Sequence, residues 1–138
     1  MTIPQGSQLP QRASGLARIF RATGYSWSGL KLAFKSEAAF RQELALVAVL
    51  SPCLFLLPAA VNLEYRMLLV LGLAVILITE LLNSAVEAIV DKTTPEFHAL
   101  AKQAKDMGSA AVFISLVLNG FLWAGALWLA FGDTGKIL

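Results

Sequence analysis

Three long apolar runs alternate with shorter polar segments along the chain. The first run covers about residues 44–61, the second 67–90 and the third 107–131. Apolar residues follow one another within each run, without the alternation over about ten residues that marks a transmembrane β-strand. A helix needs about 20 mostly apolar residues to cross a bilayer core. The pattern therefore predicts three transmembrane helices, and Pro52 and Pro58 are expected to kink the first or end it early.

A different pattern precedes the first run. Its apolar and aromatic positions recur at spacings of three and four, which is typical of a helix with one apolar face. These positions are Leu16, Phe20, Thr23, Trp27, Leu30 and Phe34. We expect this helix to lie in the membrane interface, with its aromatic face in lipid and its basic face among phosphates. The pattern alone fits equally well a helix that packs on the spans, and Gly24 is a candidate break.

Two polar segments complete the organisation. Residues 1–14 carry two prolines and several small polar residues, so we expect a disordered leader before a single membrane domain at 15–138. In the second link, Thr94-Pro95-Glu96 is a helix-start signal that predicts a short surface helix over 95–106. His98 in that link has no cysteine or histidine partner at metal-ligand spacing, so we expect it to be solvated.

The composition agrees with a membrane protein. Hydrophobic residues make up 57% of the chain and charged residues only 14%, whereas soluble domains carry about 25% charged residues. Cys53 is the only cysteine, which excludes a disulfide-stapled secreted domain. The low charge also excludes a disordered tail and a nucleic-acid binder with a basic surface.

The basic residues predict the orientation. Nine lysines and arginines lie before the first span or in the second link, against two on the other side. Because basic residues concentrate on the cytoplasmic side, we expect a cytoplasmic N-terminus and a periplasmic C-terminus. The cytoplasmic set is Arg12, Arg18, Arg21, Lys31, Lys35, Arg41, Lys92, Lys102 and Lys105, and the opposite set is Arg66 and Lys136.

Two carboxylates interrupt the second span. Glu80 and Glu87 lie about 20° apart around a helix, and Asn83 and Ser84 lie within about 60° of them. Asp91 extends this stripe at the cytoplasmic end, and Glu80 lies about 10 Å deeper than Glu87. A charged side chain at the centre of a membrane helix costs roughly 2.5–3.5 kcal/mol on insertion scales and usually faces a protein interior or a functional path.

Other charged groups are expected at the same cytoplasmic depth. Glu37 and Glu43 precede the first span, and Lys105-Asp106 precedes the third. The set resembles an oxygen-rich site for a hard divalent cation such as Mg²⁺. The alternative is that these glutamates pair with Arg41 or Lys105 and only fix helix packing. Two glutamates, an asparagine and a serine on one stripe exceed what packing needs, which favours a functional site.

Four segments resemble the prokaryotic diacylglycerol kinase family of small three-span inner-membrane enzymes. They are YSWSGLKLAF at 25–34, EAAFRQE at 37–43, ELLNSAVEAIVD at 80–91 and AKDMGSAAV at 104–112. The resemblance implies transfer of the γ-phosphoryl group of MgATP to the hydroxyl of diacylglycerol, giving phosphatidic acid, in the bacterial inner membrane. It also implies a homotrimer, with active sites between protomers at the cytoplasmic boundary.

The resemblance also implies a role for each matching position. Glu80 matches the catalytic base, Glu37 and Glu87 match metal-binding glutamates, and Asn83 matches the asparagine beside them. Positions that match ATP-binding residues are Arg18, Tyr25, Glu37, Glu87, Glu96, Phe97, His98, Lys105 and Asp106. Positions that match the lipid site are Phe40, Arg41, Gln42, Glu43 and Ser109, together with Glu80.

Other functions remain open from the sequence. The link VDKTTPEFHALAK leans towards the undecaprenol kinase branch of the family, whereas AAFRQE and AKDMGSAAV, nearer the lipid, favour diacylglycerol. A small proton-coupled transporter would use Glu80 and Glu87 as a relay, but residues 67–79 offer no further polar group on the stripe. A non-catalytic membrane subunit would be indifferent to Mg²⁺ and ATP. Both rank behind a lipid kinase.

Overall fold

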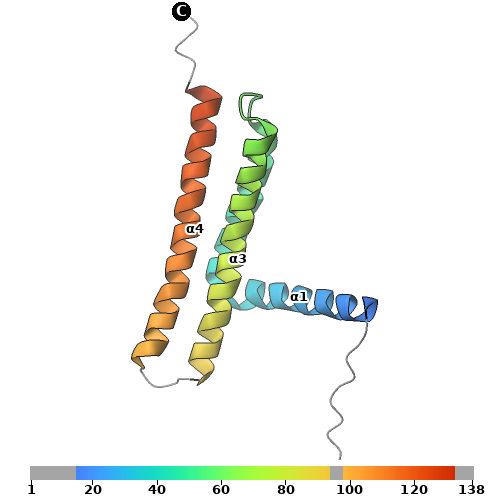
Figure 1. Ribbon diagram of the computed structural model, residues 1–138, viewed down its shortest axis with the longest axis vertical. Helices are drawn as coiled ribbons and strands as arrows, with labels where there is room; N and C mark the ends of the chain where they lie inside the picture. The colour runs from blue at the N-terminus through green and yellow to red at the C-terminus, as the bar shows by residue number, and fades with distance from the viewer. Residues whose placement is uncertain (1–14, 94–97, 133–138) are drawn as a thin grey trace, which may run out of the picture. The chain divides into compact units, whose positions relative to one another are not determined.

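A computed structural model describes residues 15–93 and 98–132, and these residues form four α-helices and no strand (Figure 1). The chain divides into two compact units, one ending at Leu32 and the other beginning at Ala33. The helices are α1 (Leu16–Ser36), α2 (Ala38–Leu56), α3 (Leu63–Thr93) and α4 (Ala99–Phe131). The expected leader at 1–14 lies outside the described residues.

Helix α1 has the amphipathic character that its sequence predicts. It runs without interruption through Gly24, so the candidate break is not a break. Its aromatic residues Phe20 and Trp27 are exposed, at 77% and 60%. The Lys31 ammonium lies 5.3 Å from the centre of the Trp27 ring, within range of a cation–π interaction. An exposed aromatic face with basic residues beside it suits a helix that lies on a membrane surface.

Helix α2 begins and ends earlier than the apolar run predicts. The run suggested a span over residues 44–61, but the helix starts at Ala38, after the extended residue Glu37, and stops at Leu56. Leu57 is extended (φ −63°, ψ 138°) because Pro58 disfavours a helical conformation in the residue before it. The second proline, Pro52, lies inside the helix.

Helix α3 is the central helix of the three long ones, because it packs against both α2 and α4. Asn62 caps its start by accepting a hydrogen bond from the Tyr65 N–H through Oδ1 at 2.9 Å. Leu69, Leu73 and Ile76 are buried at 3% exposure or less and form one face of the helix. Glu80 continues this face one turn further towards the C-terminus.

Helix α4 joins two elements that the sequence pattern treated separately. The short surface helix expected over 95–106 is not distinct from the third span, because residues 99–131 form one continuous helix. Alanine, leucine, lysine and glutamine dominate its first turns, and these strong helix formers give no reason for a break. His98 caps the start through Nδ1, which accepts from the Leu100 N–H at 3.2 Å. The expected start signal at 94–96 lies outside the described residues.

Three of the four helices, α2, α3 and α4, are long and apolar enough to cross a membrane. Most of their large apolar side chains are exposed in the single chain, such as Phe55, Leu71 and Phe121. A soluble protein would bury such residues, whereas lipid tails or neighbouring subunits accommodate them without cost.

Arg66 closes the connection between α2 and α3. Its guanidinium donates hydrogen bonds to four backbone carbonyls around the end of α2. The Pro58 carbonyl oxygen also accepts from the Val61 N–H at 3.0 Å. Carbonyls at the end of a helix lack a helical N–H partner, so the arginine satisfies groups that an apolar environment would otherwise leave unpaired. The acceptors are the carbonyl oxygens of Leu54, Leu57, Pro58 and Val61.

We expect Arg66→Met to lower the unfolding temperature in detergent micelles. The free energy of unfolding should fall by at least about 2 kcal/mol, because hydrogen bonds to charged groups contribute about 1.5–3 kcal/mol each. The unfolding temperature of Arg66→Lys should lie between those of the wild type and Arg66→Met, since one ammonium cannot reproduce the planar fork of the guanidinium. Identical unfolding temperatures for wild type and Arg66→Met would show that the connection is stable without these bonds.

Candidate active site

Glu80 lies at the centre of the candidate site. Its side chain is only 3% exposed, at the end of the buried face of α3. The Ser84 hydroxyl, one turn further along α3, donates to Glu80 Oε1 at 3.4 Å. The two remaining glutamates that the sequence singled out as metal ligands, Glu37 and Glu87, are close enough for their charges to act on Glu80. The structure thus gathers all three carboxylates, from the start of α2 and from α3.

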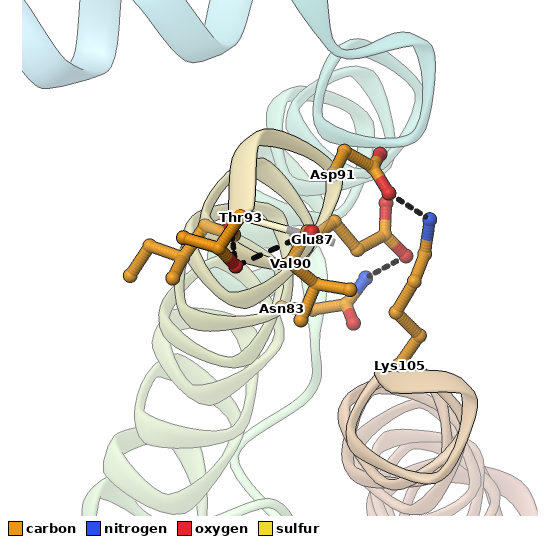
Figure 2. A network of polar contacts seen from close by, with 7 residues as sticks. Asn83, Glu87, Val90, Asp91, Thr93 and Lys105 are labelled. Atoms are coloured by element: carbon orange, nitrogen blue, oxygen red, sulfur yellow. Dashed lines mark hydrogen bonds and ion pairs between the residues drawn. The ribbon is translucent and has the colours of Figure 1, made fainter. Parts of the chain in front are cut away.

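Asn83, Glu87 and Asp91 continue the stripe of polar residues towards the C-terminal end of α3. The Asn83 amide donates to Glu87 Oε1 at 3.3 Å, as Figure 2 shows. Lys105 reaches across from α4, and its Nζ lies 2.9 Å from Asp91 Oδ1. The same ammonium interacts electrostatically with Glu87. A cation is therefore held beside the carboxylate cluster by a partner on the neighbouring helix.

Helix α2 contributes a further carboxylate. Glu43 is 7% exposed and its charge acts on Glu80. Its Oε2 is buried and has no hydrogen-bond partner among the described residues. Buried polar atoms normally have such a partner, so this oxygen is available to a hydroxyl donor or a cation. Phe40, one turn earlier, is 3% exposed and covers the same face of α2.

The start of α2 is fixed by local hydrogen bonds. Glu37 is its extended N-cap residue, and its Oε1 accepts from the Ser36 hydroxyl at 2.9 Å. Arg41 donates through Nη1 to the carbonyl oxygens of Phe34 (3.1 Å) and Lys35 (3.3 Å). Arg41 thus binds backbone carbonyls at the end of α1, not one of the glutamates. The alternative in which the glutamates pair with Arg41 finds no support in these contacts.

Gly108 allows α3 and α4 to approach beside the cluster, and the sequence pattern did not single it out. A Cβ atom at this position would overlap with Asn83 Oδ1. That oxygen is buried and lacks a hydrogen-bond partner among the described residues. Small residues are common where membrane helices pack closely, but the run around Gly108 contains several, so the sequence did not identify the contact.

The remaining candidate residues are exposed or lie outside the described residues. Arg18 and Tyr25 are exposed on α1, and Gln42, Ser109 and Asp106 are exposed on α2 and α4. Asp106 forms an ion pair with Lys102, and both side chains are 62% exposed. His98 is exposed at the start of α4, while Glu96 and Phe97 lie outside the described residues.

The donor set suits a metal that ATP helps to bind. Within residues 15–93 and 98–132, no three histidine, cysteine or acidic side chains form a group that could hold a metal ion unaided. Mg²⁺ commonly uses one or two carboxylates and completes its shell with phosphate oxygens and water. Glu37 and Glu87 therefore fit a metal that arrives with a nucleotide.

Comparisons with known proteins agree with this chemistry. Residues 24–127 match the family described as prokaryotic diacylglycerol kinase. The diacylglycerol kinase of Escherichia coli (strain K12) is 43% identical over 126 residues, which cover 90% of this chain and 100% of that protein. The diacylglycerol kinase of Pseudomonas aeruginosa is 51% identical over 114 residues, covering 83% and 91%. That of Haemophilus influenzae is 43% identical over 117 residues, covering 85% and 98%.

The contact between Gly108 and Asn83 predicts a matched pair of glycine variants. Gly108→Ala should destabilise the protein by about 1–3 kcal/mol, because the added methyl group displaces Asn83 or separates the helices. Gly120→Ala on the same helix should not destabilise it, since a Cβ there meets nothing within 4 Å. Thermal unfolding in detergent measures both. Equal unfolding temperatures for the two variants would contradict close packing at Gly108.

Proposed function

Because the chain belongs to the prokaryotic diacylglycerol kinase family, we propose that it transfers the γ-phosphoryl group of ATP to the hydroxyl of diacylglycerol and forms phosphatidic acid. The observation that carries this proposal is the buried Glu80, with the charges of Glu37 and Glu87 acting on it. Phosphoryl transfer needs mainly positioning and neutralisation of phosphate charge, together with a group that accepts the hydroxyl proton. These three glutamates divide that work between them.

The depth of each carboxylate along α3 suits one of the two substrates. At about 1.5 Å per residue, Glu80 lies about 21 Å along the helix from Arg66, and Glu87 about 32 Å. Since the hydrocarbon core is about 30 Å thick, a core that begins near Arg66 contains Glu80 and ends near Glu87. Diacylglycerol in the bilayer would then reach Glu80 from the side, while ATP would reach Glu87 from the cytosol.

In this proposal Glu80 is the general base. Its carboxylate accepts the proton of the lipid hydroxyl as the oxygen attacks the γ-phosphorus atom, and the Ser84 hydroxyl orients it from one side. Glu43 supplies a second carboxylate with one free buried oxygen, which suits a hydrogen bond from the glycerol hydroxyl. Phe40, Arg41, Gln42 and Ser109 would complete the lipid site.

Glu37 and Glu87 would hold Mg²⁺, and Asn83 orients Glu87 through its amide. Bound there with ATP, the metal ion would neutralise charge on the phosphate oxygens. Lys105 lies beside Glu87 and is suited to contact the phosphates directly, with Asp91 holding its ammonium in place. Arg18, Tyr25, Glu96, Phe97, His98 and Asp106 are proposed to bind the rest of the nucleotide.

Much of the apolar surface is exposed in the single chain, and so are Arg18, Tyr25, His98 and Asp106. Three spans can scarcely enclose two substrates, so we expect the site to be completed by neighbouring subunits. The number of subunits, three, follows from the family resemblance. The excess of lysine and arginine before α2 and between α3 and α4 supports a cytoplasmic N-terminus. Residues 15–138 are proposed to act as one membrane domain.

The relatives' names favour diacylglycerol over undecaprenol as the acceptor. A proton-coupled transporter is less well supported, because no continuous chain of ionisable groups leads from Glu80 towards the opposite end of α3. Within residues 67–79 of that helix every side chain is uncharged.

We expect Glu80→Gln to fold like the wild type and to lose about 10²–10⁴-fold in turnover, because an amide cannot accept the hydroxyl proton. Transfer of labelled phosphate from ATP to diacylglycerol measures turnover, and size and thermal unfolding in detergent check the fold. Full turnover in Glu80→Gln would rule out Glu80 as the base.

The metal assignment predicts a change in Mg²⁺ dependence. Glu87→Gln should raise the Mg²⁺ concentration needed for half-maximal activity at least about tenfold, because one anionic ligand is lost. Glu64→Gln, at the opposite end of α3, removes the same charge and should leave that concentration unchanged. If the two variants have the same Mg²⁺ dependence, Glu87 does not bind the metal.

A further inference from the structure

A second set of polar side chains connects α3 and α4, further from the C-terminal end of α3 than the carboxylates. Asn119 on α4 is 4% exposed, and its amide nitrogen donates to the Gly72 carbonyl oxygen of α3 at 2.8 Å. The same nitrogen donates to the Ser115 carbonyl oxygen within α4 at 3.0 Å. One turn nearer to the start of α4, the hydroxyl oxygens of Thr79 and Ser115 lie 3.0 Å apart, with Ser115 3% exposed. The Tyr65 hydroxyl of α3 also donates to the Leu122 carbonyl oxygen of α4, at 2.9 Å.

Gly72 makes the contact with Asn119 possible. A Cβ atom at position 72 would lie 2.8 Å from Asn119 Oδ1 and 3.0 Å from Leu122 Cδ1. Both separations are shorter than the van der Waals contact of a carbon atom with oxygen or with another carbon. The absence of a side chain therefore exposes the Gly72 carbonyl to the neighbouring helix at this level.

An interhelical hydrogen bond of this kind fixes how far one helix is displaced along the other. Apolar side chains pack against lipid nearly as well as against one another, so apolar packing distinguishes weakly between neighbouring registers in a membrane. A polar residue in an apolar interface does distinguish between them, as a single buried asparagine does in coiled coils. Sliding α4 along α3 would remove one of the two acceptors of the Asn119 amide where water cannot replace it.

The register of α3 on α4 matters for the carboxylate cluster. Gly72 and Glu80 lie on the same buried face of α3, and Thr79 immediately precedes Glu80. Lys105, beside Glu87, belongs to α4. Any displacement along the interface would shift Glu80 relative to Lys105, and a misplacement of about 1 Å can cost about 100-fold in rate.

We propose that Asn119, by binding the Gly72 carbonyl, is a positioning residue that sets the register of α3 against α4 and thereby places Glu80 for phosphoryl transfer. This inference rests on the proposed kinase function. In this role Asn119 contacts neither of the two substrates. Ser115 and Thr79 support the same register from the side nearer to Glu80.

The test compares Asn119→Leu, which keeps the side-chain size but removes the donor, with Leu118→Ala on the exposed side of α4. Asn119→Leu should lower kcat at least about tenfold and leave the KM for ATP unchanged, because positioning in the transition state is lost while nucleotide binding is retained. Leu118→Ala should keep the wild-type kcat. Turnover is expressed per folded protein, so a loss of stability alone would not mimic the effect.

A second variant decides the matter if Asn119→Leu does not fold. Gly72→Ala keeps every hydrogen-bonding group but forces Asn119 and Leu122 away, and it should show the same selective loss of kcat. A wild-type kcat in folded Asn119→Leu, or in Gly72→Ala where Asn119→Leu does not fold, would overturn the positioning role while the kinase function stands.

The contact itself is measurable without any assay of activity. In wild-type protein in lipid bilayers, solid-state NMR should detect strong dipolar coupling between the Gly72 carbonyl carbon and the Asn119 amide nitrogen. Absence of this coupling would overturn the inference. Failure of the wild type to phosphorylate diacylglycerol, with the coupling present, would instead overturn the proposed function on which the positioning role rests.

Discussion

Burial of the Glu80 carboxylate in a membrane helix is the constraint around which the rest of the structure is arranged. Lipid cannot solvate a carboxylate, so the residue must face protein, and α3 achieves this by packing between α2 and α4. The hydroxyl of Ser84 and the charges of Glu37, Glu43 and Glu87 then define its surroundings. Like charges gathered in an apolar medium need cations, which a lysine and a metal–nucleotide complex can supply.

The length of α3 places its carboxylates at different depths. A helix of 31 residues is about 46 Å long and exceeds the hydrocarbon core, so its last turns reach the boundary with water. Groups on one stripe are thereby spaced along the helix, and in the proposed function the deepest carboxylate would serve the lipid substrate and the outer ones the aqueous substrate. A membrane enzyme that transfers a phosphoryl group from ATP to a lipid needs such a spacing, and one continuous helix can provide it.

The sequence predicted the elements well and their contacts poorly. Hydrophobic runs of sufficient length identified α2, α3 and α4, and the amphipathic pattern identified α1. The ends were less accurate, because Pro58 stops α2 through the conformation of the residue before it, and because α4 continues smoothly from residue 99 into the third span. Apolar periodicity carries no information on where a helix continues into water.

Helical spacing placed Glu80, Asn83, Ser84 and Glu87 on one stripe, and the contacts within α3 follow that spacing. The contacts between helices could not be read in this way. Asn119 lies in a run whose only evident property is the absence of charge, and Gly72 and Gly108 are small residues among other small or apolar ones. Their importance depends on which faces of α3 and α4 meet, and that is a property of the packed pair.

The most direct measurement of the central claim is the destination of the labelled phosphate. Purified protein is reconstituted in vesicles that contain both diacylglycerol and undecaprenol, and γ-labelled ATP is supplied with Mg²⁺. A carboxylate base held in the bilayer beside a diacylglycerol site predicts that the label appears in phosphatidic acid. Label found in undecaprenyl phosphate, or only in inorganic phosphate, would contradict it.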